Sequence, residues 1–86
     1  MTKEQEIEIL MEDYCTRSEA ENHLKCGTIV FEEADLKKHC ESYVKEWKFD
    51  EEEAETFRIM LNGGKLFADW GKVEKDGNTF YIMYCL

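Results

Sequence analysis

Apolar residues recur at helical spacing in the first third of the chain. The spacing of three and four positions predicts a helix over about residues 3–13, with an inner face of Ile7, Leu10, Met11 and Tyr14. Thr2 lies before this helix as an N-cap, in a capping box with Gln5. The alternation of Glu and Ile over residues 6–9 also fits a short strand.

The next segments predict a second helix, a strand and two further helices. A capping box at Thr16 starts a helix over about 17–25, which Gly27 ends, and the β-branched and aromatic residues 28–31 then form a strand. The clearest helix carries an apolar stripe that belongs in the core: Leu36, Cys40, Tyr43, Val44 and Trp47. Asp50 caps a last helix with an inner face of Ala54, Phe57 and Leu61, and the Asn-Gly-Gly of 62–64 ends it.

The C-terminal part of the chain predicts a β-hairpin. Residues 70–75 form one strand, the Asp-Gly-Asn of 76–78 forms the turn, and residues 79–86 return as a second strand. Both faces of the returning strand are largely apolar, so we expect the fold to cover it on both sides. Four short helices, this hairpin and a third short strand predict an α+β fold, in a single compact domain over 1–86.

Charge is the unusual property of the composition. Twenty Asp and Glu against eleven Lys and Arg give a net charge of −9 over 86 residues. This sign excludes a protein that grips nucleic-acid phosphates or an anionic membrane with its overall field. The first residues lack the basic flank and apolar run of a signal peptide, so we expect a cytoplasmic protein whose four cysteines stay reduced.

Histidine and cysteine residues offer two kinds of candidate chemistry. The four side chains that could bind zinc are His23, Cys26, His39 and Cys40. Adjacent residues on a helix point about 100° apart, so His39 and Cys40 do not converge on one ion, and Cys40 already belongs to the apolar stripe. A thiolate activated by imidazole is the other option, but no orienting motif surrounds any Cys and His pair. We therefore expect no metal, no cofactor and no catalysis.

Carboxylates are the remaining candidates for a functional site. They are densest at the start of the helix after Asp50, where the outward-facing residues are Glu51, Glu52 and Glu55. A second group consists of Glu32, Glu33 and Asp35. Trp70, between Asp and Gly in an expected loop, is a candidate exposed anchor for a partner. The alternative interpretation is that both acidic groups are only solvated faces.

Four blocks of the chain resemble small acidic accessory proteins carried by conjugative elements and phages of Gram-positive gut bacteria. The blocks are residues 16–25, 28–33, 69–74 and 76–84. The resemblance implies the setting of a mobile element, in which small acidic proteins often serve as anti-CRISPR or antirestriction inhibitors. It implies no catalytic residues.

Together these features predict a non-enzymatic inhibitor that presents carboxylates to the basic nucleic-acid channel of a host defence protein such as a Cas nuclease. Such channels hold the backbone of a heteroduplex or read a short DNA motif with arginines, so an acidic protein can compete for the same contacts. The alternative is a structural or regulatory protein of the element, dimeric through the terminal hairpin, whose acidity only maintains solubility.

Overall fold

The computed structural model describes residues 1–62 and 70–85. Within them the fold is α+β, as the sequence predicts, and a third strand pairs with the hairpin. The elements in chain order are α1 (Lys3–Glu12), α2 (Arg17–Cys26), β1 (Ile29–Glu32), α3 (Glu33–Glu46), α4 (Glu51–Leu61), β2 (Trp70–Lys75) and β3 (Asn78–Met83). Two predictions fall partly outside the described residues: Gly63 and Gly64 as part of the signal that ends the last helix, and residue 86 as the end of the second hairpin strand.

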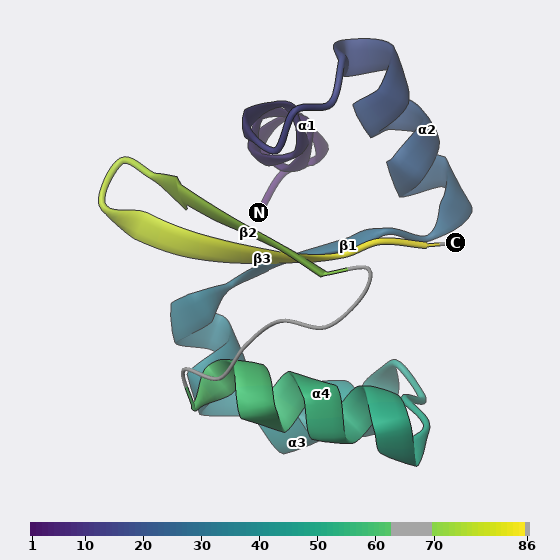
Figure 1. The fold of residues 1–86 in the computed structure, drawn as a ribbon, viewed down its shortest axis with the longest axis vertical. Helices are drawn as coiled ribbons and strands as arrows, with labels where there is room; N and C mark the ends of the chain where they lie inside the picture. The colour runs from purple at the N-terminus through teal and green to yellow at the C-terminus, as the bar shows by residue number, and fades with distance from the viewer. Residues whose placement is uncertain (63–69, 86) are drawn as a thin grey trace.

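The sheet is antiparallel throughout, with strand order β1-β3-β2 (Figure 1). The last strand in the sequence is therefore the central strand, and β1 and β2 are its edges. Helices α1 and α2 lie over one face of the sheet, and α3 and α4 lie over the other (Figure 1). The prediction that β3 is covered on both sides is confirmed.

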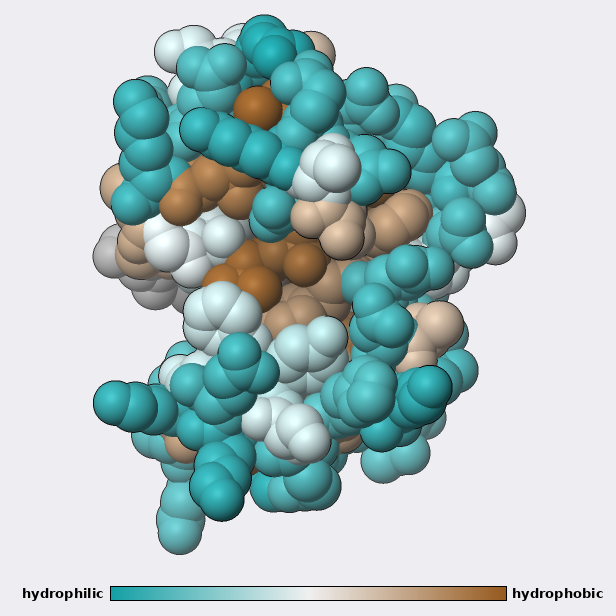
Figure 2. Space-filling model, turned by 180° about the vertical axis from the view of Figure 1, so that it is seen from behind, coloured by the Kyte–Doolittle hydropathy of each residue, from teal (hydrophilic) through white to brown (hydrophobic). Residues whose placement is uncertain are grey.

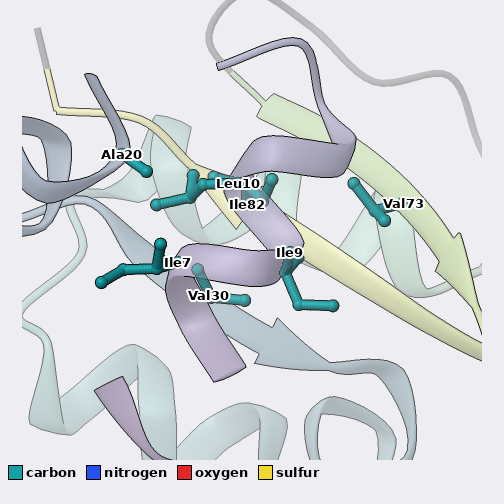
Figure 3. Packing of buried hydrophobic residues seen from close by; sticks show 7 residues of the cluster. All are labelled: Ile7, Ile9, Leu10, Ala20, Val30, Val73 and Ile82. Atoms are coloured by element: carbon teal, nitrogen blue, oxygen red, sulfur yellow. The ribbon is translucent and has the colours of Figure 1, made fainter. Parts of the chain in front are cut away.

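Two apolar clusters separated by the sheet form the core. The first joins α1 and α2 to the sheet and contains Ile7, Ile9, Leu10, Ala20, Val30, Val73 and Ile82 (Figure 3). The second joins α3 and α4 to the other face and contains Phe31, Leu36, Phe57, Met60 and Tyr81. Alternate residues of β1 and β3 point into different clusters because successive side chains of a strand face opposite ways.

The predicted inner face of α1 is wrong at its C-terminal end. Met11 is 43 % exposed, and Tyr14 is 98 % exposed beyond the end of the helix. The reason is the backbone: Tyr14 has φ of 68°, so the chain leaves the helix before the stripe reaches that position. Ile9 is buried in place of these residues, which places both isoleucines of the ambiguous 6–9 segment on a helix.

The predicted apolar stripe of α3 is also wrong at its C-terminal end. Leu36 is fully buried, whereas Trp47, which we expected in the core, is 46 % exposed. Helix α3 kinks at His39, where φ is −123° and ψ is 19°, and it ends at Glu46 before Lys48 takes a positive φ. Cys40, Tyr43 and Val44, which follow the kink, still pack against the second core cluster, so the stripe fails only at Trp47, where the helix has already ended.

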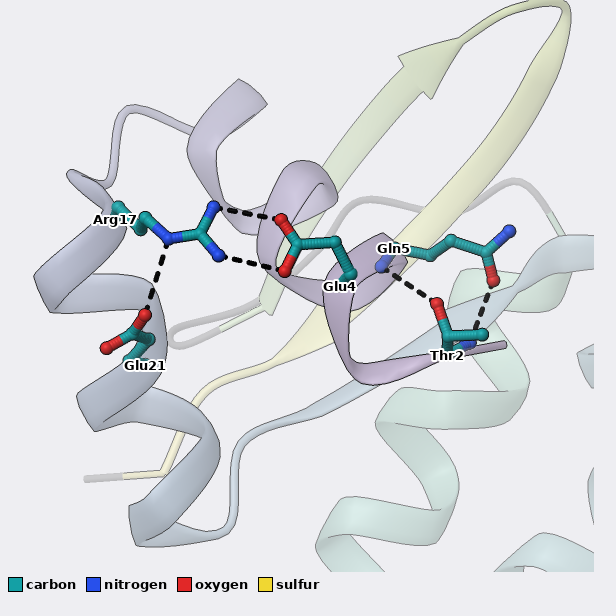
Figure 4. A network of polar contacts seen from close by, with 5 residues as sticks. All are labelled: Thr2, Glu4, Gln5, Arg17 and Glu21. Carbon is teal, nitrogen blue, oxygen red and sulfur yellow. Dashed lines mark hydrogen bonds and ion pairs between the residues drawn. The ribbon is translucent and has the colours of Figure 1, made fainter.

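Capping and ion pairs fix the helix ends. Capping boxes at Thr2 and Thr16 satisfy free N–H groups of α1 and α2, as predicted. Arg17 at the start of α2 forms two hydrogen bonds, of 2.9 and 2.8 Å, with the carboxylate of Glu4 on α1 (Figure 4). Arg17 also pairs with Glu21 one turn further along α2 (Figure 4). This polar network ties the two helices of one layer together at the surface.

Candidate functional site

The N-terminus of α4 presents the densest carboxylate group. Asp50 is the N-cap, and its side chain accepts a 2.8 Å hydrogen bond from the backbone N–H of Glu53. The side chain of Glu53 in turn accepts a 3.3 Å hydrogen bond from the backbone N–H of Asp50. Buried Ala54 and Phe57 fix the inner face of the helix. Two acids are thus used for capping, and the others are left to face solvent.

The three predicted contact residues of α4, Glu51, Glu52 and Glu55, are all exposed. No ion pair joins any of them to a cation of residues 1–62 or 70–85. The nearby Arg58 instead forms hydrogen bonds of 2.9 and 3.1 Å with Glu41 on α3. This arrangement leaves three carboxylates available to accept hydrogen bonds from lysine or arginine side chains of a partner.

Glu51 and Glu55 also border a shallow groove between α3 and α4. Its lining includes the apolar side chains of Val44, Phe49 and Ala54, together with Arg58, whose guanidinium is paired with Glu41. An apolar floor beside carboxylates suits the aliphatic stem and charged head of a lysine or arginine side chain.

The second predicted group, at the junction of β1 and α3, is not uniform. Glu33 accepts a 2.9 Å hydrogen bond from the hydroxyl of Tyr81 and pairs at 2.9 Å with Lys37. Lys37 and then Tyr81 hold the pKa of Glu33 below its usual value. Glu33 is therefore engaged within the fold and is a poor candidate for a partner contact. Glu32 is half-buried and Asp35 is exposed, and both line a cleft along β1.

The structure does not bring the two acidic groups together. One lies at the start of α3, and the other follows its end. Fourteen helical residues at 1.5 Å each span about 21 Å. Along this length α3 carries Lys37, Lys38 and Lys45. The acidic surface of this layer is therefore two separate patches.

Trp70 does not occupy the loop that we expected. It is the first residue of β2, is half-buried, and packs against the second core cluster, with its ring 5.7 Å from that of Phe57. Tyr81 is buried, and Tyr84 is half-buried with its hydroxyl bonded to Asp13. The exposed tryptophan of the described residues is Trp47.

Histidine and cysteine residues form no candidate metal centre in the described parts of the chain, where no group of three or more His, Cys, Asp or Glu residues is arranged to hold a metal ion. The ring of His23 packs edge-on against Tyr84 at 5.0 Å. Burial raises the pKa of the Cys15 and Cys40 thiols, which lowers their thiolate fraction at neutral pH. These features indicate structural roles for both thiols.

Two features of interest were not predicted from the sequence. The hydrogen bond between Tyr84 and Asp13 joins residues 71 positions apart, and no local pattern signals such a contact. The cleft along β1 exists because β1 is an edge strand, which depends on the order of strands in the sheet. An apolar strand followed directly by acidic residues was the only local signal for this cleft.

Comparison with known proteins adds no assignment. No protein family, characterised protein or solved structure matches this chain. Among the described residues, no helix is long and apolar enough to cross a membrane. The case for a function therefore rests on the surfaces themselves.

Proposed function

We propose that this protein is a non-enzymatic inhibitor that binds a basic nucleic-acid-handling protein, most concretely a Cas nuclease, and blocks its nucleic-acid channel. The observation that carries the proposal is the carboxylate group of Glu51, Glu52 and Glu55, exposed and without an ion-pair partner among the described residues. This group, rather than Glu33 or Trp70, is the partner surface that we assign.

Spacing and rigidity support mimicry of a phosphate backbone. Glu51 and Glu55 are one helical turn apart, about 6 Å along the axis, which is close to two phosphate repeats of about 3.4 Å each. The capping box and the burial of Phe57 and Met60 hold the helix in place. A preformed array loses little conformational entropy on binding, and a channel lined with Lys and Arg supplies the complementary charges.

The proposal is tested by measuring binding to Cas9-type effectors over a series of salt concentrations. The test variant replaces Glu51, Glu52 and Glu55 with Gln, which removes three of the nine net negative charges. The control variant removes the same charge elsewhere, by E12Q, E74Q and D76N on exposed residues of α1 and the hairpin.

We expect the test variant to bind at least about tenfold more weakly than the control, with a smaller dependence of affinity on salt. Equal weakening by both variants would show that only net charge matters and would refute the assigned surface. Absence of binding by the unmodified protein to every effector tested would refute the proposed partner class.

The alternative, a dimer through the terminal hairpin, receives less support. The outer edge of the hairpin is β2, because β3 is paired on both sides. Exposed Lys72 and Glu74 lie on β2, and charges on an edge strand discourage pairing with another copy. Light scattering over a range of concentrations separates the two functions, since a tight dimer that hides β2 would favour the alternative.

A further inference from the structure

The other sheet edge, β1, lies at the floor of a cleft between the two helical layers. Residues 27–32 form the floor, Glu6 and Leu24 lie on the side of α1 and α2, and Asp35, Tyr43 and Trp47 lie on the side of α3. The cleft has a volume of 460 Å³, within the range of ligand-binding pockets. Seen from behind, the molecule is hollowed here, and hydrophobic side chains show between hydrophilic surfaces above and below (Figure 2).

The sheet register shows which backbone groups of β1 face the cleft. Asp76 and Gly77 both have positive φ, so the hairpin has a two-residue type I′ turn, and Lys75 and Asn78 flank it as a hydrogen-bonded pair. Hydrogen-bonded pairs alternate with non-bonded pairs along antiparallel strands. Residues 78, 80 and 82 of β3 therefore bond to β2, and residues 79, 81 and 83 point their backbone groups toward β1.

The partners of Tyr81 and Met83 on β1 are Phe31 and Ile29. The remaining two residues of β1, Val30 and Glu32, consequently direct their backbone groups away from β3 and into the cleft. The carbonyl of Glu32 is the N-cap carbonyl of α3 and accepts a helical hydrogen bond. Two N–H groups and the carbonyl of Val30 remain to pair with an added strand.

The side chains around this edge combine apolar surface with negative charge. Trp47 is 46 % exposed, and Leu24 and Tyr43 are half-buried. Three carboxylates line the same cleft, those of Glu6, Glu32 and Asp35, and no lysine or arginine of the described residues lines it. Burial raises the pKa of Glu6, and the N-terminal ammonium of Met1, which also lines the cleft, offsets only part of this effect.

We propose that this cleft binds an extended segment of another protein, in which apolar residues alternate with lysine or arginine, as a fourth strand beside β1. Such β-augmentation uses backbone hydrogen bonds for affinity and side-chain pockets for specificity. Alternate side chains of the added strand would face the two walls, where the apolar surfaces and carboxylates lie. The inference goes beyond the proposed inhibitor function, because it concerns a different surface.

Charge decides between this occupant and a second copy of the chain. Pairing two copies of β1 would bring two sets of Glu6, Glu32 and Asp35 together, from chains of net charge −9. Like charges at such short range oppose association, whereas a basic segment brings the opposite charge to this acidic cleft. Trp47 also offers a ring face that attracts a lysine or arginine side chain.

The first test is amide hydrogen exchange of the full chain by NMR, with an acetylated and amidated seven-residue peptide that alternates Lys or Arg with Val. In the free protein, we expect the amides of Val30 and Glu32 to exchange faster than those of Ile29 and Phe31. Saturating peptide should slow exchange at Val30 and Glu32 at least tenfold. A peptide with Glu in place of Lys and Arg should not slow exchange at these two amides.

Three results would overturn the proposal. Val30 and Glu32 amides that are already protected in the free protein would show that the edge is not open. Peptide binding that leaves both amides unchanged would place the peptide elsewhere. Protection that rises with protein concentration in the absence of peptide would identify a second copy as the occupant.

The second test compares variants by peptide titration. W47A and D35N remove an apolar contact and a carboxylate from the cleft, and each should weaken peptide binding at least fivefold. The matched controls Y14A and E12Q change exposed residues away from the cleft and should leave peptide binding unchanged. Equal effects of test and control variants on peptide binding would refute the cleft as the binding site.

The variant with Gln at 51, 52 and 55 separates this proposal from the inhibitor function. We expect it to bind the peptide within about threefold of the unmodified protein while losing affinity for the nuclease. Loss of peptide binding in this variant to the same extent as in D35N would show that overall charge, not the cleft, attracts the peptide and would refute the proposal.

Discussion

Gly71 in β2 is the position where the structure predicts the most specific effect of a single methyl group. A Cβ atom at this residue would lie 2.7 Å from Oδ2 of Asp13 and 3.3 Å from Cε2 of Tyr84. These are the two residues whose side chains are hydrogen-bonded to each other. G71A should therefore force them apart, and close approach is what requires glycine at this position.

The expected cost combines two effects. Insertion of a methyl group into packed surroundings costs about 1–3 kcal/mol, and a hydrogen bond to a charged group is worth about 1.5–3 kcal/mol when it is lost. Alanine also restricts the unfolded chain more than glycine does, which stabilises the folded protein by about 0.4–1 kcal/mol and offsets part of this cost. We expect G71A to lower the free energy of unfolding by about 2–5 kcal/mol.

A double-mutant cycle with D13A tests the cause. Removal of the Asp13 side chain eliminates the atoms nearest the new methyl group, so G71A in that background should be neutral or slightly stabilising. The free energies of unfolding of the four proteins, from urea titrations, should give a coupling of at least about 2 kcal/mol. Effects that add to within about 0.5 kcal/mol would refute the steric argument.

Gly77 provides the matched control for this cycle. An added Cβ at Gly77 meets nothing within 4 Å, but φ is +78°, so G77A should cost about 1–2 kcal/mol through backbone strain alone. Because this strain is independent of Asp13, G77A and D13A should be additive. Coupling between them would indicate that D13A changes the whole fold and would invalidate the cycle.

Two further predictions concern the second core cluster. Burial, and then the hydrogen bond to Glu33, raise the pKa of Tyr81 to about 12 from 10. The stability that this raised pKa provides is complete below pH 10 and is lost as pH rises toward 12. Y81F should therefore flatten the alkaline loss of unfolding free energy in urea titrations, and an unchanged profile would show that the pKa of Tyr81 is not raised. L36A should lower the free energy of unfolding by about 2–5 kcal/mol because Leu36 is fully buried. W47A removes a larger side chain but should lower it by less than about 1 kcal/mol. Similar losses for the two variants in thermal melts would place Trp47 in the core.

Local chemistry made much of the fold predictable. The Thr2 and Thr16 capping boxes depend on residues three positions apart, and both helices begin where these pairs indicate. The turn was predicted at residues that tolerate positive φ, and it joins the two predicted strands, although it is shorter than the expected 76–78 because Asn78 already belongs to β3. The apolar character of both faces of β3 was enough to predict that the strand is covered on both sides.

What could not be predicted depends on contacts between distant residues or on small changes in backbone direction. The α3 stripe was extrapolated to Trp47 as if the helix continued, but α3 ends at Glu46, one residue before it. Whether Glu33 is free depends on the register that places Tyr81 beside it, 48 positions away. The exposure of Glu51, Glu52 and Glu55 was predictable, because buried Ala54 and Phe57 determine the opposite face.

The central position of β3 also constrains the order of folding during synthesis. Both core clusters need side chains from this last strand, and the Thr28 hydroxyl accepts a hydrogen bond from the backbone of a residue 57 positions later. A nascent chain in which residues 78–83 have not yet emerged from the ribosome cannot complete either layer. Such non-local pairing slows folding and leaves helices with uncovered apolar faces in the meantime. We expect chains truncated before Asn78 to be recognised by chaperones and proteases rather than to persist as folded fragments.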